Sequence, residues 1–157
     1  MMKLEIREAG EDDAQSILNC LEVAFTPYRN QYTRDAFADT VVNLQMFQAR
    51  MRHMHILVAV CEGAIVGTVS GAICEHGEGH LRGMAVLPQH KGTGIAAQLL
   101  NAIERWLQEH GCTRVTLGTT RPLQAAAKFY QKHGYVHSGR VSDFFGMPLL
   151  EYVKQLS

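Results

Sequence analysis

The sequence Met-Ala-Val-Leu-Pro-Gln-His-Lys-Gly-Thr-Gly-Ile-Ala at positions 84–96 combines three local signals. An apolar run ends at Leu87, a proline and two glycines follow, and an amphipathic pattern begins at Ile95. The apolar run predicts a strand, and the pattern predicts a helix from about Gly92 to His110. One face of that helix is expected to carry Ile95, Leu99, Ile103, Trp106 and Leu107. The stretch therefore predicts a strand that turns directly into a helix.

The turn between this strand and helix has the composition of an anion site. Amides in the first turn of a helix have no partner within the helix, and they add to the positive end of its dipole. Gly92 and Gly94 let the backbone approach a ligand without a Cβ atom in the way, and Lys91 adds a positive charge. The loop therefore predicts a phosphate or pyrophosphate site. A tight strand-to-helix turn without a ligand is the alternative that two glycines alone leave open.

Two common nucleotide motifs do not fit the loop. Lys91 precedes the first glycine, so the spacing of a Walker loop is absent. A dinucleotide fingerprint requires a third small residue after Gly94 and an acidic residue on the next strand, but residues 114–120 contain no carboxylate.

The rest of the chain supplies further alternating strands and helices. Strands are expected at residues 3–8, His55–Cys61, Ile65–Cys74, His80–Leu87, Arg114–Thr120, Tyr135–Val141 and Leu149–Leu156. Further helices are expected from the acidic residues 11–13 to the end at Thr26-Pro27, over Thr33–Arg52 and over Leu123–His133. An antiparallel hairpin followed by a βαβ unit implies a mixed sheet. The sequence predicts an α/β fold with about seven strands flanked by four helices, as one domain over residues 1–157.

Composition narrows the class of protein. The chain has 157 residues, 46% hydrophobic and 19% charged, as is typical of a globular protein. Net charge is zero, which argues against nucleic acid as a partner. No apolar run approaches the roughly 20 residues that span a bilayer, and the start lacks the apolar core of a signal peptide, so we expect no membrane partner and a cytoplasmic location.

Charge is uneven along the chain. Residues 1–78 carry 6 basic and 11 acidic side chains, whereas residues 79–157 carry 9 and 4. An anionic ligand is therefore expected to bind the second half, although pairing of the two halves within one fold would also explain the asymmetry.

Cysteine and histidine spacings predict no metal site. Cys20, Cys61, Cys74 and Cys112 include no CxxC pair, and we expect buried, reduced thiols. The eight histidines match no zinc-binding spacing.

Two segments resemble the GNAT superfamily of N-acetyltransferases. Gln89-x-x-Gly92-x-Gly94 looks like the acyl-CoA pyrophosphate motif of that family, and residues 126–135 (Ala-Ala-Lys-Phe-Tyr-Gln-Lys-His-Gly-Tyr) resemble its A-x-x-[LF]-Y-x-[KR]-x-G-[FY] segment. The expected order of elements also matches over essentially the whole chain. The resemblance implies a GNAT-like fold and acetyl-CoA as the acetyl donor.

The resemblance assigns residues to the coenzyme. It implies that the backbone of Met84, Ala85 and Val86 pairs with the pantetheine amides as an added strand does. It also implies that the pyrophosphate binds the loop formed by Lys91, Gly92, Thr93, Gly94, Ile95 and Ala96. Two residues depart from the family pattern. Lys91 replaces the commoner arginine, and Leu123 stands where the family often has asparagine, so one side-chain contact to the coenzyme does not carry over.

Catalytic residues follow from the same resemblance and from chemistry. Tyr130 matches the family position of the general acid, which protonates or hydrogen-bonds the leaving thiolate; packing as a core aromatic is the alternative. A protonated amine must also lose a proton to a carboxylate or histidine. Candidates at the start of the central strand are Glu75, His76, Glu78 and His80, and we favour Glu78 or His80.

Acceptor residues are expected on two loops. Tyr28, Arg29 and Tyr32 lie between the first two helices, where relatives border the acceptor cleft, and Asp143–Pro148 form the opposite rim. Their aromatic character suggests a partly apolar acceptor; packing for stability alone is the alternative. We expect direct acetylation of a primary amine on a small molecule or peptide, and a possible homodimer, as relatives often form. A catalytically weak acyl-CoA-sensing module and a non-enzymatic interaction domain are the competing hypotheses.

Overall fold

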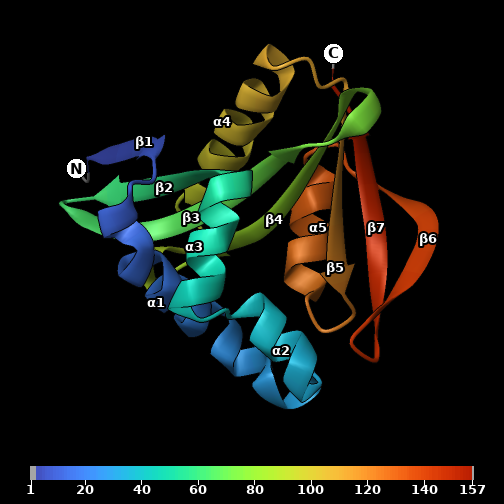
Figure 1. The fold of residues 1–157 in the computed structure, drawn as a ribbon, viewed down its shortest axis with the longest axis horizontal. Helices are drawn as coiled ribbons and strands as arrows, with labels where there is room; N and C mark the ends of the chain where they lie inside the picture. The colour runs from blue at the N-terminus through green and yellow to red at the C-terminus, as the bar shows by residue number, and fades with distance from the viewer. Residues whose placement is uncertain (1–2, 157) are drawn as a thin grey trace.

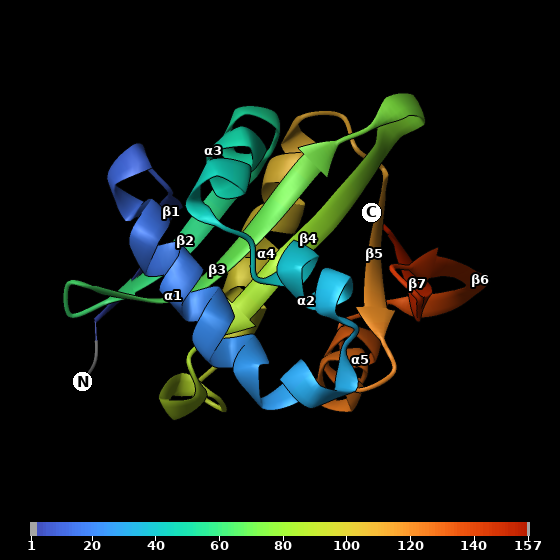
Figure 2. The same ribbon diagram turned by 60° about the horizontal axis from the view of Figure 1, so that its bottom comes forward.

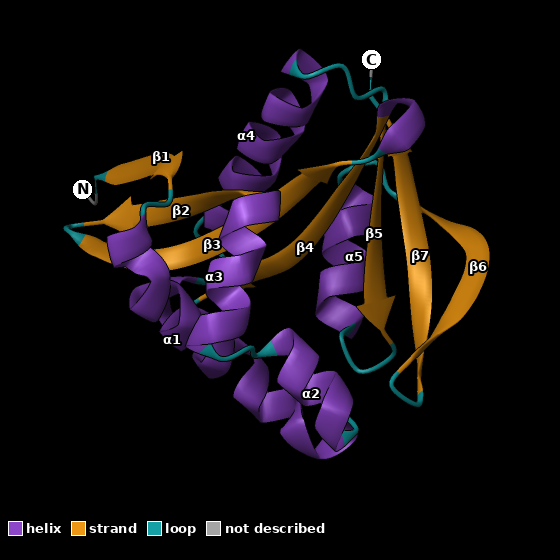
Figure 3. Cartoon of the chain, viewed as in Figure 1, coloured by secondary structure: helices purple, strands orange, loops and turns teal. Residues whose placement is uncertain are grey.

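The computed structural model describes residues 3–156, so Met1, Met2 and Ser157 of the expected domain lie outside the described residues. Its strands are β1 (Leu4–Glu8), β2 (His55–Cys61), β3 (Ala64–Ile73), β4 (Glu78–Val86), β5 (Arg114–Thr120), β6 (Val136–Phe144) and β7 (Met147–Gln155) (Figures 1 and 3). Its α-helices are α1 (Ala14–Phe25), α2 (Arg34–Thr40), α3 (Leu44–His53), α4 (Ile95–Glu109) and α5 (Gln124–Lys132). None of the helices among these residues is long and apolar enough to cross a bilayer.

The seven strands form one mixed sheet in the order β1-β2-β3-β4-β5-β7-β6. All neighbours are antiparallel except β4 and β5, which are parallel and connected through α4. The parallel pairing runs only from Glu78↔Arg114 to Leu81↔Leu117. Beyond that point β4 pairs only with β3 and β5 only with β7, so the sheet splits into two parts (Figure 1).

Helices cover both faces of the sheet. α1 and α3 pack on one face, over a core that includes Ile17, Phe47 and Val58, and α4 lies on the opposite face (Figure 2). The second core lies under α4 and also takes in Tyr130 of α5 and Tyr135. The mixed α/β architecture predicted from the sequence is therefore confirmed.

Three glycines determine how closely α4 approaches the sheet. A Cβ atom at Gly67, Gly71 or Gly79 would lie 3.0 Å or less from side-chain carbons of Leu99, Ile103 and Leu107, respectively. Those leucines and isoleucine follow each other at four-residue spacing on α4, and all three are fully buried. The row of glycines on β3 and β4 therefore seats one ridge of α4 directly against the sheet.

The expected single helix over Thr33–Arg52 is wrong, and the count of four helices with it. The chain forms α2 and α3 as separate helices, because Val41 leaves the helical region (φ −106°, ψ 83°) and Asn43 caps a new helix through a 2.8 Å bond from Met46 N–H to its side-chain oxygen. Val42 between them is buried in the core. The apolar stripe continued across this break, so periodicity alone did not reveal it.

Other boundaries shift in smaller ways. The loop expected to carry Tyr28 and Arg29 is a 3₁₀ helix over Thr26–Gln31, and α4 begins at Ile95, three residues later than expected. β6 extends to Phe144 and pairs with Met147, so the expected loop Asp143–Pro148 is reduced to a tight turn. Cys74 is exposed, contrary to expectation, because it lies beyond the end of β3; Cys20, Cys61 and Cys112 are buried.

A buried carboxylate connects α4 to the strands beyond the split. Glu104 of α4 is 8% exposed; its Oε2 accepts a 2.7 Å hydrogen bond from the Tyr135 hydroxyl, and its Oε1 lies 2.9 Å from Nζ of Lys154 on β7. The ammonium group also lies 5.6 Å from the centre of the Tyr135 ring. This cluster therefore joins α4, the start of β6 and β7 across the sheet.

We expect Lys154→Met to destabilise the protein by about 3 kcal/mol, because the Glu104 carboxylate then stays buried without a cation. Replacing both partners, as Glu104→Gln with Lys154→Met, is expected to restore at least half of that loss, since no uncompensated charge remains. Urea unfolding at pH 7 measures both variants. Equal losses in the single and double variants would contradict an electrostatic role for the cluster.

Candidate active site

The split between β4 and β5 leaves an edge of β4 exposed inside the sheet. Among the described residues, the backbone of Met84, Ala85 and Val86 has no strand partner on the β5 side. The split coincides with a bulge in β4, since Thr68 pairs with Ala85 whereas Ser70 pairs with Arg82. A bulge bends a strand away from its neighbour, and the unpaired edge it leaves can bind an extended chain that carries amide groups.

The loop after β4 leads to the N-terminus of α4 at the end of this edge. Gly92 and Gly94 adopt positive φ angles of 78° and 84°, and no atom lies within 4 Å of a Cβ at either position. Gly94 is the N-cap and offers no side-chain acceptor, so the first-turn amides of α4 have no partner among the described residues. These glycines are thus needed for the backbone conformation as well as for close approach. The loop and helix together suit an anionic ligand.

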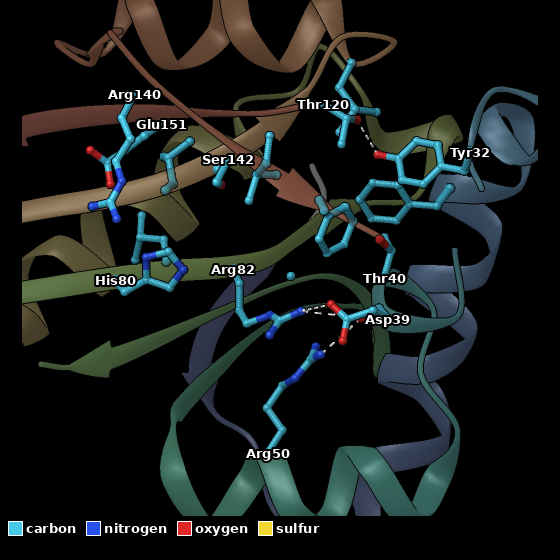
Figure 4. A pocket seen from close by; sticks show the side chains of 18 residues that line it. Tyr32, Asp39, Thr40, Arg50, His80, Arg82, Thr120, Arg140, Ser142 and Glu151 are labelled. Carbon is cyan, nitrogen blue, oxygen red and sulfur yellow. Dashed lines mark hydrogen bonds and ion pairs between the residues drawn. The ribbon is translucent and has the colours of Figure 1, made fainter. Parts of the chain in front are cut away.

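A cavity of about 310 Å³ lies beside the split, on the face of the sheet covered by α1 and α3 (Figure 4). Residues of β4 and β5 on both sides of the split form its floor, and α2, α3, β6 and β7 contribute its walls. Its lining includes Phe25, Tyr32, Asp39, Thr40, Arg50, His80, Leu81, Arg82, Gly83, Leu117, Gly118, Thr120, Leu123, Arg140, Ser142, Phe144, Leu149 and Glu151. The cavity is thus half polar, and its charged groups come from five different elements.

His80 of β4 is a neutral base within this lining. Burial, followed by the nearby charge of Arg82, lowers the pKa of His80 below its usual 6.5, and Glu78 and Glu151 oppose that shift. Its Nδ1 lies 2.9 Å from Oγ1 of Thr116, whose hydroxyl donates to the Gly79 carbonyl at 3.5 Å. Thr116 therefore accepts from Nδ1–H, and this tautomer leaves Nε2 free to take a proton.

Two arginines contact Asp39 at the opposite end of the cavity, one through its carboxylate and both through its backbone oxygen. Arg82 of β4 lies 2.9 Å from Oδ2 of Asp39 and 3.4 Å from its backbone oxygen, to which Arg50 of α3 also donates at 3.4 Å. Figure 4 shows both guanidinium groups directed at Asp39. Burial, followed by the charge of Arg82, lowers the pKa of Arg50 to about 10, and the charge of Asp39 opposes that shift. The three side chains therefore carry a net positive charge at pH 7.

Tyr130 of α5 lies outside the cavity lining and is 7% exposed. Its ring packs against Phe129 and Tyr135, with ring centres 5.4 and 5.7 Å away. Burial raises the pKa of its hydroxyl well above 10, and no hydrogen bond to that hydroxyl is found among the described residues. The phenol is therefore protonated at neutral pH and free to donate to a ligand.

The structure brings together only some of the residues expected for catalysis and acceptor binding. Tyr32 and His80 both line the cavity. The Tyr32 hydroxyl lies 2.6 Å from Oγ1 of Thr120. Tyr28 and Arg29 are not in the lining; the Arg29 guanidinium lies 4.6 Å from the centre of the Phe37 ring. Glu78 is also outside it and lies 3.8 Å from Arg114.

Glu75 and His76 are exposed at the turn before β4. Of residues 143–148, which were expected to form one rim of the acceptor site, only Phe144 lines the cavity. Five charged residues of the lining were not predicted from the sequence: Asp39, Arg50, Arg82, Arg140 and Glu151. Arg82 had a usable signal, because it is two residues after His80 on a strand and must share its face. The others are distant in sequence, and no local pattern relates them to the site.

Known proteins share the sequence pattern and the fold of this chain. Residues 14–135 match the model of the Acetyltransferase (GNAT) family. The chain is similar to the PaiA N-acetyltransferase of Thermoplasma acidophilum, solved in complex with coenzyme A, at 17% identity and a TM-score of 0.79, covering 98% of this chain and 99% of that one.

Two further solved structures share the fold. The ribosomal-protein-S18-alanine N-acetyltransferase of Escherichia coli is 13% identical with a TM-score of 0.80, covering 99% of this chain and 95% of that one. The ribosomal-protein-alanine N-acetyltransferase of Brucella melitensis is 24% identical with a TM-score of 0.74, covering 97% and 99%. The family match spans most of the sequence, and it includes both segments that carried the resemblance. The chain therefore belongs to the Acetyltransferase (GNAT) family.

Proposed function

We propose that the protein transfers an acetyl group from acetyl-CoA to a primary amine bound in the cavity beside the β4–β5 split. One observation carries this proposal: the gap between β4 and β5 lies next to two different binding surfaces. An amide-lined strand edge and a helix N-terminus suit the donor, and the cavity with a neutral imidazole suits the acceptor. The same β4 strand contributes to both surfaces.

The residues of the donor side fit coenzyme A. The edge formed by Met84, Ala85 and Val86 would hold its pantetheine amides, and residues 91–96 would hold its pyrophosphate. When bound, the coenzyme supplies an acetyl thioester, which reacts with an unprotonated amine. Lys91 is exposed at the loop and adds a charge for the phosphates.

The two protonation tasks fall to different residues. His80 would take a proton from the incoming ammonium group through Nε2, because the imidazole is neutral at pH 7 and lines the cavity. Tyr130 would donate a hydrogen bond or the proton of its hydroxyl to the departing sulfur, since burial keeps the phenol protonated. Glu78 is the weaker candidate for the base because it lies outside the cavity lining beside Arg114.

We expect Gly94→Asp to weaken acetyl-CoA binding by about 1000-fold, because a carboxylate beside the phosphates costs about 4 kcal/mol at protein-surface screening. Gly111→Asp is the matched control. Gly111 also has a positive φ (91°) and open space around its Cβ position, but it lies beyond the C-terminal end of α4. Calorimetry on both folded variants measures the effect. Unchanged affinity in Gly94→Asp would remove the loop from the coenzyme site.

We expect Tyr130→Phe to leave coenzyme affinity unchanged and to slow thiol release by about 100-fold, the low end for a positioned acid, because a thiolate leaves fairly well unaided. Tyr135→Phe is the control, since its ring packs against Tyr130 while its hydroxyl bonds Glu104. That variant should lose stability and keep its turnover. Full turnover in Tyr130→Phe would assign the residue to packing only.

We expect His80→Gln to lower the turnover number by about 100-fold or more at saturating acetyl-CoA and amine, whereas His76→Gln, an exposed position, leaves it unchanged. The base acts in its neutral form, so the rate falls as pH drops through the pKa of His80. Because that pKa is lowered, the acid limb of the parent profile should have its midpoint below pH 6.5. The turnover number is measured against pH in both proteins, and the acid limb is expected to disappear in His80→Gln. An identical limb in the variant would exclude His80 as the base.

A further inference from the structure

Arg50 is a cation without an anionic partner of its own. Among the described residues, no carboxylate lies within 4.0 Å of its guanidinium, and its one hydrogen bond goes to the Asp39 backbone oxygen at 3.4 Å. The Asp39 carboxylate is bound instead by Arg82. A half-buried guanidinium gains most from an anion that can satisfy its remaining donors.

The free side of Arg50 faces the point where the sheet splits. A Cβ atom placed on Gly83 would lie 3.7 Å from Nη1 of Arg50 and 3.7 Å from Oγ of Ser70. Gly83 lies in the bulge of β4 and lines the cavity. Any larger residue there would place a side chain beside the guanidinium, so glycine keeps this cation accessible from the cavity.

We propose that the acceptor is a small amine that carries a carboxylate, and that Arg50 together with Arg82 binds this carboxylate; the proposal rests on the acetyl-transfer function proposed above. The cluster of Arg50, Arg82 and Asp39 carries one net positive charge, which a single carboxylate neutralises. A phosphate, with close to two negative charges, would leave an excess of negative charge in the site.

The proposed anion and base sites lie in one cavity. His80 and Arg82 are two residues apart on the same face of β4, so both side chains line that cavity. Arg50 of α3 lines the same cavity. A small molecule that carries both an amine and a carboxylate therefore has a base for the first group and cations for the second.

The test compares matched amines in a thiol-release assay with saturating acetyl-CoA. L-Methionine, L-phenylalanine and L-leucine are paired with 3-(methylthio)propylamine, 2-phenylethylamine and 3-methylbutylamine, which lack the carboxylate. In the parent protein we expect kcat/KM to be about 100-fold higher for the best carboxylated amine than for its partner. Comparable values across every pair would overturn the proposal and leave acetyl transfer itself intact.

Variants of Arg50 locate the effect. Arg50→Met should raise KM for carboxylated amines about 100-fold and change the others less than twofold, and Arg50→Lys should recover part of the loss. Arg52→Met is the control, because Arg52 is exposed on the same helix. An equal fall in kcat for every amine would indicate that Arg50 acts on the reaction of the thioester and does not bind the acceptor carboxylate, and it would overturn the proposal. Unchanged acetyl-CoA affinity shows that the variants are folded.

A binding experiment separates this proposal from the transfer function. Calorimetry measures N-acetyl-L-methionine, N-acetyl-L-phenylalanine and N-acetyl-L-leucine against the protein saturated with coenzyme A. Binding by the parent protein that is lost in Arg50→Met supports the carboxylate site. If no amine promotes thiol release, acetyl transfer is refuted, but such binding would still support the carboxylate site. Binding that is unchanged in Arg50→Met, or no binding by any of the three, would overturn the carboxylate site.

Discussion

The parallel pairing of β4 with β5 stops after Leu81 and Leu117, and both the exposed edge of β4 and the cavity beside it depend on that interruption. Had the pairing continued, the backbone of Met84–Val86 would be occupied by its neighbour and the floor of the cavity would be closed. The bulge opposite Ser70 and Thr68 bends β4 at the same place. Backbone polar groups buried without partners are costly, so a break of this kind inside a sheet is tolerated where a ligand or solvent completes the bonding.

Rigid packing on either side keeps the split in place. The ridge of α4 lies against the glycines of β3 and β4, which fixes the helix N-terminus relative to the strand edge. Glu104 then joins the same helix to Tyr135 and to Lys154 of β7, so both parts of the sheet are tied to α4. The proposed donor surface therefore lies on elements whose mutual positions are determined by the core, as a preorganised site requires.

Local signals in the sequence predicted the fold and the glycine-containing turn from β4 into α4. Alternation and helical spacing determine elements over short windows, and the resemblance of residues 84–96 and 126–135 to one family is confirmed by the family match. The break between α2 and α3 escaped prediction because the helical spacing of Phe37, Val41, Leu44, Phe47 and Met51 continues through it. The cavity was only partly foreseen, through Tyr32 and His80. Arg50 and Asp39 reach it by the tertiary packing of α2 and α3, which no local pattern encodes.

The proposed donor surface is built almost entirely from backbone groups, whereas the proposed acceptor cavity is lined by residues of seven helices and strands, with charged side chains from five of them. Most substitutions change side chains and leave strand edges and helix amides in place. Apart from the glycines, the donor surface is therefore buffered against sequence drift, while single exchanges at positions such as 50, 82 or 140 alter the charge offered to an acceptor. A scaffold divided in this way can change its acceptor by point mutation while its donor stays the same. Engineering of a new acceptor specificity can begin with those positions and leave residues 84–96 untouched.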